Sequence, residues 1–324
     1  MTKTQHSRTG LSLLFILALL VASCGQAATP GQGGGKLEGT ITISGAFALY
    51  PMIIRWGEEF KKLHPDVKLD ISAGGAGKGM SDTLAGAVDI GMVSREIYPE
   101  EEQKGAFWVP VTRDAVFVTV NQKNPVWEDL RRTGIKQDTF IGIYITGKIT
   151  TWGQVVGRPE VTDSIHVFTR SDACGAADAW AKYLGNKKQE DLMGVGVYGD
   201  PGLLDAVVKD PLGIGYNNLN YAFDAGTGQA VAGAAIVPID ADGNGQADPA
   251  ETYSAKKEAM DAVATGRYPS PPARDLNLVT KSKPSGLTKA FIAWILTDGQ
   301  QYVAEVGYIA LAKDKLEEAL KKLD

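Results

Sequence analysis

The sequence has few of the residues that build metal centres and disulfide frameworks. Its 324 residues include two cysteines and three histidines, which excludes a disulfide-rich scaffold and a four-cysteine zinc site. It also lacks an excess of basic residues, because 33 Lys and Arg are outnumbered by 38 Asp and Glu, for a formal net charge of −5. A nucleic-acid-binding protein needs a basic face, so we do not expect nucleic acid among the partners.

The N-terminal apolar run is too short to cross a membrane. Residues 11–22 form this run of twelve residues, which follows Lys3 and Arg8, whereas a membrane-spanning helix needs about 20. A basic segment followed by a short apolar one is typical of a secretory signal peptide. The sequence therefore predicts export from the cytoplasm.

The segment Val21-Ala22-Ser23-Cys24-Gly25 resembles a bacterial lipobox. The resemblance implies a signal peptide at residues 1–23 and a lipidated Cys24 that begins the mature chain and holds it at a membrane surface, in the periplasm or on the cell surface. The alternative is a plain secretory signal with an incidental cysteine. Residues 24–39 are rich in Gly, Ala and Gln, which predicts a flexible tether.

The rest of the chain alternates between strand-like and helix-like segments. Apolar and alternating residues predict strands at 40–44, 67–71, 89–93 and 115–120. Helical spacing predicts helices at 52–63 and around 80–87. Strands that alternate with helices indicate an α/β fold with largely parallel sheets, and the length suggests about two domains.

Three segments have a strand–loop–helix form, at 44–51, 72–80 and 169–178, and a fourth strand ends at Ser94 and Arg95. In α/β folds, ligands lie where strand ends meet helix starts. Helix N-termini bind anions through free N–H groups and the positive end of the helix dipole. The pattern favours an anion-binding protein.

Seven segments resemble, in order, those of the phosphate-binding proteins of bacterial phosphate ABC importers. They are SGAFALYP (44–51), VDIGMVSREI (88–97), ITGKITTWGQVVG (145–157), TRSDACGAAD (169–178), GIGYNNLNYA (213–222), GRYPSP (266–271) and FIAWILTDGQQYVAEVGYIAL (291–311). The resemblance implies a periplasmic-binding-protein type II fold, with two α/β lobes and a hinge between them. It places lobe 1 at residues 40–120 plus 277–324, and lobe 2 at residues 121–276.

The resemblance also implies which residues hold the oxyanion. Arg170 matches the family's arginine, Asp172 matches a residue that orients it, and Ser94 matches a ligand hydroxyl, with Arg95 beside it. The candidate ligand-binding set is Ala48, Leu49, Ala76, Gly77, Ser94, Arg95, Arg170, Asp172, Cys174, Gly175 and Ala176.

Several members of this set depart from the family pattern. Cys174 and Ala176 stand where the family has Ser and Thr, and Leu49 stands where a Thr gives its hydroxyl. Ala76 and Gly77 stand where serines are expected. Backbone N–H groups, Ser94 and the two arginines remain to hold an anion, and charged hydrogen bonds of roughly 1.5–3 kcal/mol each compensate for lost hydroxyls.

The sequence therefore predicts a monomer that captures phosphate between its lobes and delivers it to an ABC permease in the membrane. The departures leave other oxyanions (sulfate, molybdate, tungstate), a small organic anion, or a tethered anion sensor as alternatives. The enzyme alternative is an extracellular phosphatase. Ser94 and Cys174 have no nearby histidine in any motif, so a nucleophile with a base is missing and we expect no enzyme.

Cys174 itself has two readings. It is either a small residue that fills a Ser-sized space, or a reactive thiol, because a helix N-terminus beside Arg170 lowers a thiol pKa.

Residues 240–251 match the EF-hand pattern D-x-[DN]-x-[DN]-G-x₅-E at every specified position. The expected ligands are Asp240, Asp242, Asn244, Gln246 through its backbone carbonyl, Asp248 and Glu251. The preceding AAIVPI looks like a strand rather than a helix, so we expect a lone loop that binds structural Ca²⁺ with a Kd of roughly 10⁻⁴–10⁻³ M. The alternative is an acidic turn that binds nothing.

Overall fold

The computed structural model describes residues 36–324, and Leu37–Asp324 forms one compact unit. The predicted signal peptide (1–23), Cys24 and the tether up to residue 35 lie outside the described residues. Gly39, at the end of the predicted tether, is already the first residue of strand β1. In the described part of the chain, no helix combines the length and the apolar character that a membrane span requires.

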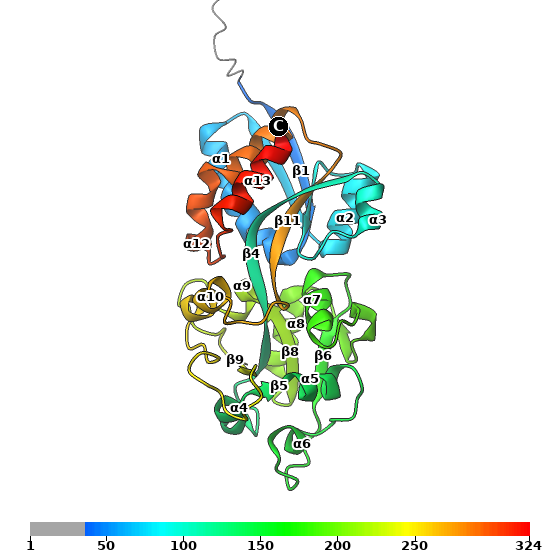
Figure 1. Cartoon of the computed structure of the whole chain (residues 1–324), viewed down its shortest axis with the longest axis vertical. Helices are drawn as coiled ribbons and strands as arrows, with labels where there is room; N and C mark the ends of the chain where they lie inside the picture. Colours follow the sequence, from blue (N-terminus) through cyan, green and yellow to red (C-terminus); the bar gives the residue numbers. More distant parts are fainter. Residues whose placement is uncertain (1–35) are drawn as a thin grey trace, which may run out of the picture. The chain divides into compact units, whose positions relative to one another are not determined.

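Strands run through both lobes of this unit (Figure 1). Their bounds are β1 Gly39–Gly45, β2 Val67–Ala73, β3 Ile90–Val93, β4 Ala106–Asn121, β5 Ile135–Lys136, β6 His166–Arg170, β7 Val195–Val197, β8 Gly213–Asn218, β9 Ala234–Ile236, β10 Ile239–Asp240 and β11 Ala273–Lys281.

The α-helices cover the strands in each lobe. They are α1 Tyr50–Leu63, α2 Ala76–Ala85, α3 Pro99–Gln103, α4 Trp127–Thr133, α5 Gln137–Tyr144, α6 Trp152–Val156, α7 Gly175–Tyr183, α8 Gly199–Lys209, α9 Leu219–Ala222, α10 Lys256–Ala264, α11 Gly286–Leu296, α12 Val303–Val306 and α13 Lys313–Leu323. Short 3₁₀ helices are η1 Phe47–Leu49, η2 Gln189–Asp191 and η3 Asp298–Tyr302.

One nine-stranded sheet joins the lobes, in the order β2-β1-β3-β11-β4-β8-β6-β7, with β9 paired to β4. The outer strands pair in parallel, β1 with β2 and β3 in lobe 1 and β6 with β7 and β8 in lobe 2. The central strands β11 and β4 pair antiparallel with each other and with β3 and β8. The expectation of largely parallel sheets is therefore wrong at the centre, because β4 and β11 carry the chain between the lobes in opposite directions.

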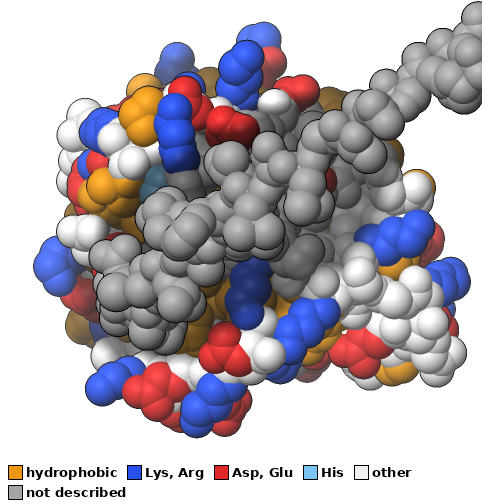
Figure 2. All heavy atoms as spheres, turned by 90° about the horizontal axis from the view of Figure 1, so that it is seen from above, with side chains coloured by type: hydrophobic (Ala, Val, Ile, Leu, Met, Phe, Trp, Pro, Cys, Tyr) orange, Lys and Arg blue, Asp and Glu red, His pale blue; other side chains and the backbone are white. Residues whose placement is uncertain are grey.

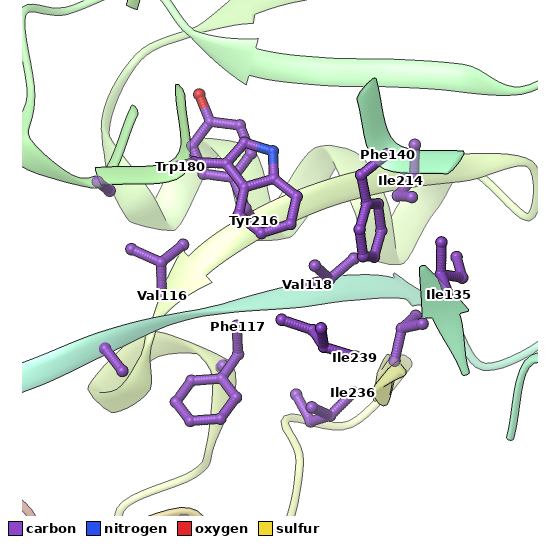
Figure 3. Packing of buried hydrophobic residues seen from close by; sticks show 14 of the residues in the cluster. Val116, Phe117, Val118, Ile135, Phe140, Trp180, Ile214, Tyr216, Ile236 and Ile239 are labelled. Atoms are coloured by element: carbon purple, nitrogen blue, oxygen red, sulfur yellow. The ribbon is translucent and has the colours of Figure 1, made fainter. Parts of the chain in front are cut away.

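Each lobe has its own hydrophobic core. The core of lobe 1 is built from buried residues between 41 and 111 and between 276 and 323. The core of lobe 2 uses buried residues between 115 and 273, with Ile309. Figure 3 shows this second core, where Trp180 of α7 stacks on Tyr216 of β8 with ring centroids 6.0 Å apart. The two-lobed α/β fold predicted from the sequence is confirmed.

The surface of the described part mixes charges of both signs. Figure 2 looks onto the lobe 1 end of the molecule, where basic and acidic side chains are interspersed. In lobe 1, for example, Lys313 and Glu317 form an exposed ion pair across one turn of helix α13. Such exposed pairs contribute little to stability, on the order of 0.2–1 kcal/mol each.

Candidate anion-binding site

The predicted loops converge where the two lobes meet. Gly77, in the first turn of α2, donates its N–H to the carbonyl of Ala173, just before α7, at 2.9 Å. Gly74 and Gly75 donate to the carbonyl of Gly45 at 2.9 and 3.0 Å. The segments 44–51, 72–80 and 169–178 therefore form one site, with lobe 1 in direct contact with lobe 2.

Ser94 lies at the centre of this contact and is 2% exposed. A Cβ atom added at Gly175 would collide with the backbone carbonyl and the hydroxyl of Ser94. Only glycine therefore allows the N-terminus of α7 to approach Ser94 this closely. The structure brings Ser94 and Gly175 together, as the predicted set requires.

Arg170 is the buried cation of the site. Its Nε and Nη2 donate to the two carboxylate oxygens of Asp172 at 2.8 and 2.6 Å, and its Nη1 donates to Asp200 at 2.6 Å. Burial opposes the charge, but the carboxylates of Asp200 and Asp172 outweigh it and raise the pKa of Arg170 above its ordinary value. Because a guanidinium has five N–H groups, one on Nη1 and one on Nη2 remain for a ligand.

Four backbone N–H groups of buried residues in the converging loops have no hydrogen-bond partner within residues 36–324. They belong to Ala48, Ala76, Gly175 and Ala176, in the first turns of η1, α2 and α7. Orphaned buried N–H groups are rare in native proteins, and helix N-termini present such groups to anions. The backbone of the site is therefore arranged to receive an acceptor from outside the chain.

Other members of the predicted set are occupied within the protein. The N–H of Leu49 bonds to the carbonyl of Ala46 at 3.2 Å, and the Leu49 side chain lies in the core of lobe 1. Phe47 covers the site instead, with its ring centroid 5.3 Å from the guanidinium carbon of Arg170. The first loop thus offers the backbone of Ala48 and an aromatic cover rather than a side-chain hydroxyl.

Arg95 is paired with an acidic side chain of its own lobe. Its Nη1 and Nη2 donate to both carboxylate oxygens of Glu101 at 2.9 and 2.7 Å, and its guanidinium lies over the ring of Tyr98 at 4.2 Å. Its charge is therefore compensated by Glu101 in this structure. Arg95, Gly77 and Cys174 line a pocket of about 690 Å³ at the lobe boundary, together with Tyr98 and Lys182.

Cys174 caps helix α7. Its Sγ accepts the N–H of Ala177 at 3.4 Å, and the residue is 6% exposed. Burial raises the pKa of the Cys174 thiol to about 12, although Arg170 acts in the opposite direction. The thiol therefore stays protonated at neutral pH, which supports the reading as a small residue in a Ser-sized space rather than a reactive thiol.

Sequence reasoning missed four buried side chains around this site: Asp200, Asn218, Arg274 and Asp114. Asp200 is the second residue of α8, which follows strand β7 after Tyr198 alone, so the strand–loop–helix signal used elsewhere could have found it. The other three lie within strands β8, β11 and β4. Asn218 falls in the family-like segment 213–222, whereas no local motif marks Arg274 or Asp114.

The EF-hand-like loop lies in lobe 2, away from these residues in sequence, after the predicted strand segment that β9 and β10 form. Carboxylate oxygens of Asp240, Asp242 and Glu251 all lie within 4.8 Å of one another. Asp240 is 3% exposed, and its Oδ1 and Oδ2 accept the N–H groups of Asn244 and Gly245 at 3.1 and 2.9 Å. The oxygen-only donor set fits the preference of Ca²⁺.

Comparison with known proteins places these features in a family. Residues 30–299 match the model of the PBP superfamily domain. The phosphate-binding protein PstS of Bacillus subtilis is 26% identical over 318 residues, covering 94% of this chain and 95% of the relative. PstS of Pseudomonas aeruginosa is 25% identical over 338 residues, covering 94% of each chain.

Solved structures agree in fold. A Clostridium perfringens substrate-binding protein with bound phosphate is 25% identical, with a TM-score of 0.67 over 85% of this chain and 100% of that chain. An ABC-type phosphate transport receptor from Vibrio cholerae, at 22% identity, has a TM-score of 0.61 over 84% of this chain and 100% of its own. The resemblance seen in the sequence is confirmed, and the chain belongs to the PBP superfamily.

Proposed function

We propose that this chain is an extracytoplasmic binding protein that captures phosphate between its lobes and delivers it to an ABC permease. The observation that carries the proposal is the set of four unpartnered N–H groups, all on buried residues, in the first turns of the helices that follow the predicted loops. The similarity to phosphate-binding relatives over 94% of the chain supports the choice of phosphate among oxyanions. No nucleophile with a base accompanies the site in the described residues, so we propose binding without turnover.

The site compensates for its missing hydroxyls through the backbone. The N–H groups of Ala48, Ala76, Gly175 and Ala176, two N–H groups of Arg170 and the Ser94 hydroxyl make up the donors for an oxyanion. Charge-assisted hydrogen bonds are shorter and stronger than neutral ones. Asp172 and Asp200 neutralise much of the Arg170 charge, so recognition rests on directed donors more than on net positive charge.

Isothermal titration of inorganic phosphate into ligand-stripped mature protein tests this proposal. We expect micromolar or tighter binding, and about a hundredfold or greater loss in Arg170→Ala, which corresponds to about 3 kcal/mol. Ser94→Ala should weaken binding less, because it removes a single neutral hydrogen bond. Arg131→Gln, an exposed arginine paired with Glu128 on α4, serves as the control and should bind like the wild type.

The selectivity of the titration decides between phosphate and the alternatives. No heat with phosphate, but heat with sulfate, molybdate, tungstate or a small carboxylate, would show that the departures from the family pattern have changed the ligand. Release of product from a phosphate ester would contradict the absence of enzymatic turnover.

We further propose that the loop at residues 240–251 binds a structural Ca²⁺ ion. The converging oxygens of Asp240, Asp242 and Glu251 support this proposal, together with the complete match to the EF-hand pattern. The remaining candidate ligands are Asn244, Gln246 and Asp248. When bound, the ion would neutralise the repulsion among these carboxylates, and the chain's contribution is to hold the loop in its curled form.

We also propose that the mature protein is a monomer anchored by a lipid at Cys24. The lipobox-like segment before Cys24 supports the anchor, and the binding-protein relatives support a partner permease in the membrane.

A further inference from the structure

Arg274 occupies the point where the chain crosses between the lobes. It is the second residue of β11 and lies opposite Asp114 of β4 in the antiparallel register. Just beyond this pair, β4 leaves β11 and pairs with β8 of lobe 2 from Val116 onward. The Arg274 side chain is 9% exposed, so its guanidinium is buried at the junction of both lobes.

The guanidinium of Arg274 contacts both lobes at once. Its Nε donates to the carbonyl of Ser94 in lobe 1 at 3.0 Å, and its Nη2 donates to Oδ1 of Asn218 in lobe 2. Its Nη1 has no hydrogen-bond partner among the described residues and lies 3.9 Å from Oδ2 of Asp114. The planar fork of an arginine suits such a bridge, because its donors point in fixed and different directions.

The bridge continues to the site arginine. Asn218 donates its backbone N–H and its Nδ2 to the two oxygens of Asp200 at 3.1 and 2.8 Å. Asp200 in turn accepts Nη1 of Arg170 at 2.6 Å. Asp200 is 0% exposed and Asn218 is 2% exposed, and a buried polar network whose members are hydrogen-bonded makes the structure around it rigid.

We propose that Arg274 is a positioning residue that holds Ser94 of lobe 1 in register with the hydrogen-bond network Asn218–Asp200–Arg170 of lobe 2. In this way it keeps the closed site assembled around its anion. This inference rests on the proposed function for the identity of the anion, whereas the hydrogen bonds of Arg274 to Ser94 and Asn218 stand without it. Arg274 acts through Ser94 and Asn218, because it donates to the backbone carbonyl of Ser94 and to the side chain of Asn218 and leaves the Ser94 hydroxyl free for the anion.

The substitution Arg274→Lys separates this role from simple charge pairing. A lysine ammonium keeps a positive charge beside Asp114, but its single nitrogen cannot reach the Ser94 carbonyl and Asn218 together with the geometry of the fork. We expect the dissociation rate of phosphate to rise about tenfold or more, with the association rate changed by less than about threefold, as measured by stopped-flow tryptophan fluorescence. Arg113→Gln, on the neighbouring position of β4 and paired with Asp275, is the matched control and should leave both rates unchanged.

A double-mutant cycle tests the connection to Asn218. If both residues act through one hydrogen-bond network, the double variant Arg274→Lys with Asn218→Ala should weaken binding about as much as the stronger single change. An effect equal to the product of the two single fold-changes would show independent sites and overturn the proposal. Wild-type kinetics in folded Arg274→Lys would overturn it as well.

A measurement without ligand keeps the inference distinct from the proposed function. Hydrogen exchange of phosphate-free full-length mature protein should be faster in Arg274→Lys than in wild type, both around Ser94 and in β8, and unchanged in α13. If wild-type protein does not bind phosphate, the proposed function fails, while this exchange pattern still supports the bridge. Exchange that is equal in both proteins around Ser94 and β8 would refute it.

Discussion

Asp114 is a fully buried carboxylate at the lobe boundary, and neither of its oxygens has a hydrogen-bonding side chain in the described residues. Burial raises the pKa of Asp114 to about 6 from an ordinary 3.8, and the nearby Arg274 guanidinium offsets only part of this effect. Between pH 4 and 6 the folded protein therefore binds more protons at this position than the unfolded chain. By linkage, the contribution of Asp114 to the free energy of unfolding falls as the pH rises through this window, and stays at its lower value above pH 6.

Asp114→Asn should remove this pH dependence, because an amide does not ionise. We expect the free energy of unfolding of wild type minus that of the variant to fall by about 2.4 kcal/mol between pH 4 and pH 7.5, measured by urea unfolding of both proteins. Asp205→Asn, an exposed residue paired with Lys209 on α8, should give a difference that stays nearly flat with pH. A flat difference for Asp114→Asn would mean that its carboxyl titrates alike in the folded and unfolded chains.

For single residues, the sequence predicts which side chains reach the site better than it predicts their partners. Arg170 and Ser94 lie in segments with a recognisable local pattern, and the structure brings both to the lobe boundary. Arg95 was expected beside them, but its partner Glu101 lies in the next helix, and nothing in the residue pair Ser94-Arg95 indicates which way the guanidinium turns. Arg274 bonds to Ser94 and Asn218, which lie 180 and 56 residues away in the sequence, and such partners are set by topology rather than by local spacing.

At the scale of elements, hydrophobic periodicity located the strands and helices well but not their ends. Helix α2 begins at Ala76, before the predicted start near residue 80. The sequence predicts the later start because Gly77 and Gly79 lower the local helix propensity. Strand β4 begins at Ala106, although the sequence indicated only residues 115–120. Pro110 and the polar run around Arg113 hide its first half, which is the half that pairs with β11.

The loop at residues 240–251 predicts that Ca²⁺ raises the thermal stability of the protein. The Ala247 N–H bonds to the carbonyl of Arg132 at 2.9 Å, and β10 pairs with β5, so ion binding should stabilise lobe 2 as a whole. With a Kd of roughly 10⁻⁴–10⁻³ M, 10 mM CaCl₂ should add about 1.4–2.7 kcal/mol. We expect a rise of several degrees in the Tm measured by calorimetry, after prior chelation.

Glu251→Gln should abolish this rise, because the twelfth position supplies the bidentate ligand. Glu317→Gln, in the exposed pair with Lys313 on α13, should keep it. An equal rise with MgCl₂, or in the Glu251→Gln protein, would show a general salt effect instead of a calcium site.

At the scale of the whole molecule, the resemblance of seven segments to a known family gave the two-lobed architecture that composition and periodicity alone do not. Periodicity indicated α/β and predicted parallel sheets, whereas the structure has antiparallel strands at its centre. The reason is that two strands must carry the chain between lobes, and local patterns do not record which direction a strand runs relative to its neighbours.

The proposed lipid anchor at Cys24 makes a prediction about where the whole molecule lies in the cell. Intact-mass spectrometry of protein extracted from membranes of a cell that processes lipoproteins should show a diacylglyceryl adduct on Cys24. Cys24→Ser should lose the adduct and release the protein from the membrane fraction, because the proposed anchor needs a thiol to carry the lipid. Cys174→Ser, at the other cysteine, should keep the adduct; release of both variants alike, or of neither, would contradict an anchor at Cys24.

The division of the two cores along the chain has a consequence for the order of folding during synthesis. The core of lobe 2 needs residues from 115 to 273, apart from Ile309, and is therefore almost complete while the last 50 or so residues are still being made. The core of lobe 1 includes Phe291, Ile295 and Leu323 of the C-terminal helices. Residues 41–111 therefore cannot complete their core until the C-terminal residues have been synthesised. A nascent chain will thus have a folded lobe 2 while residues 39–111 of lobe 1 still lack their partners. Chaperone contacts should therefore concentrate on residues 39–111.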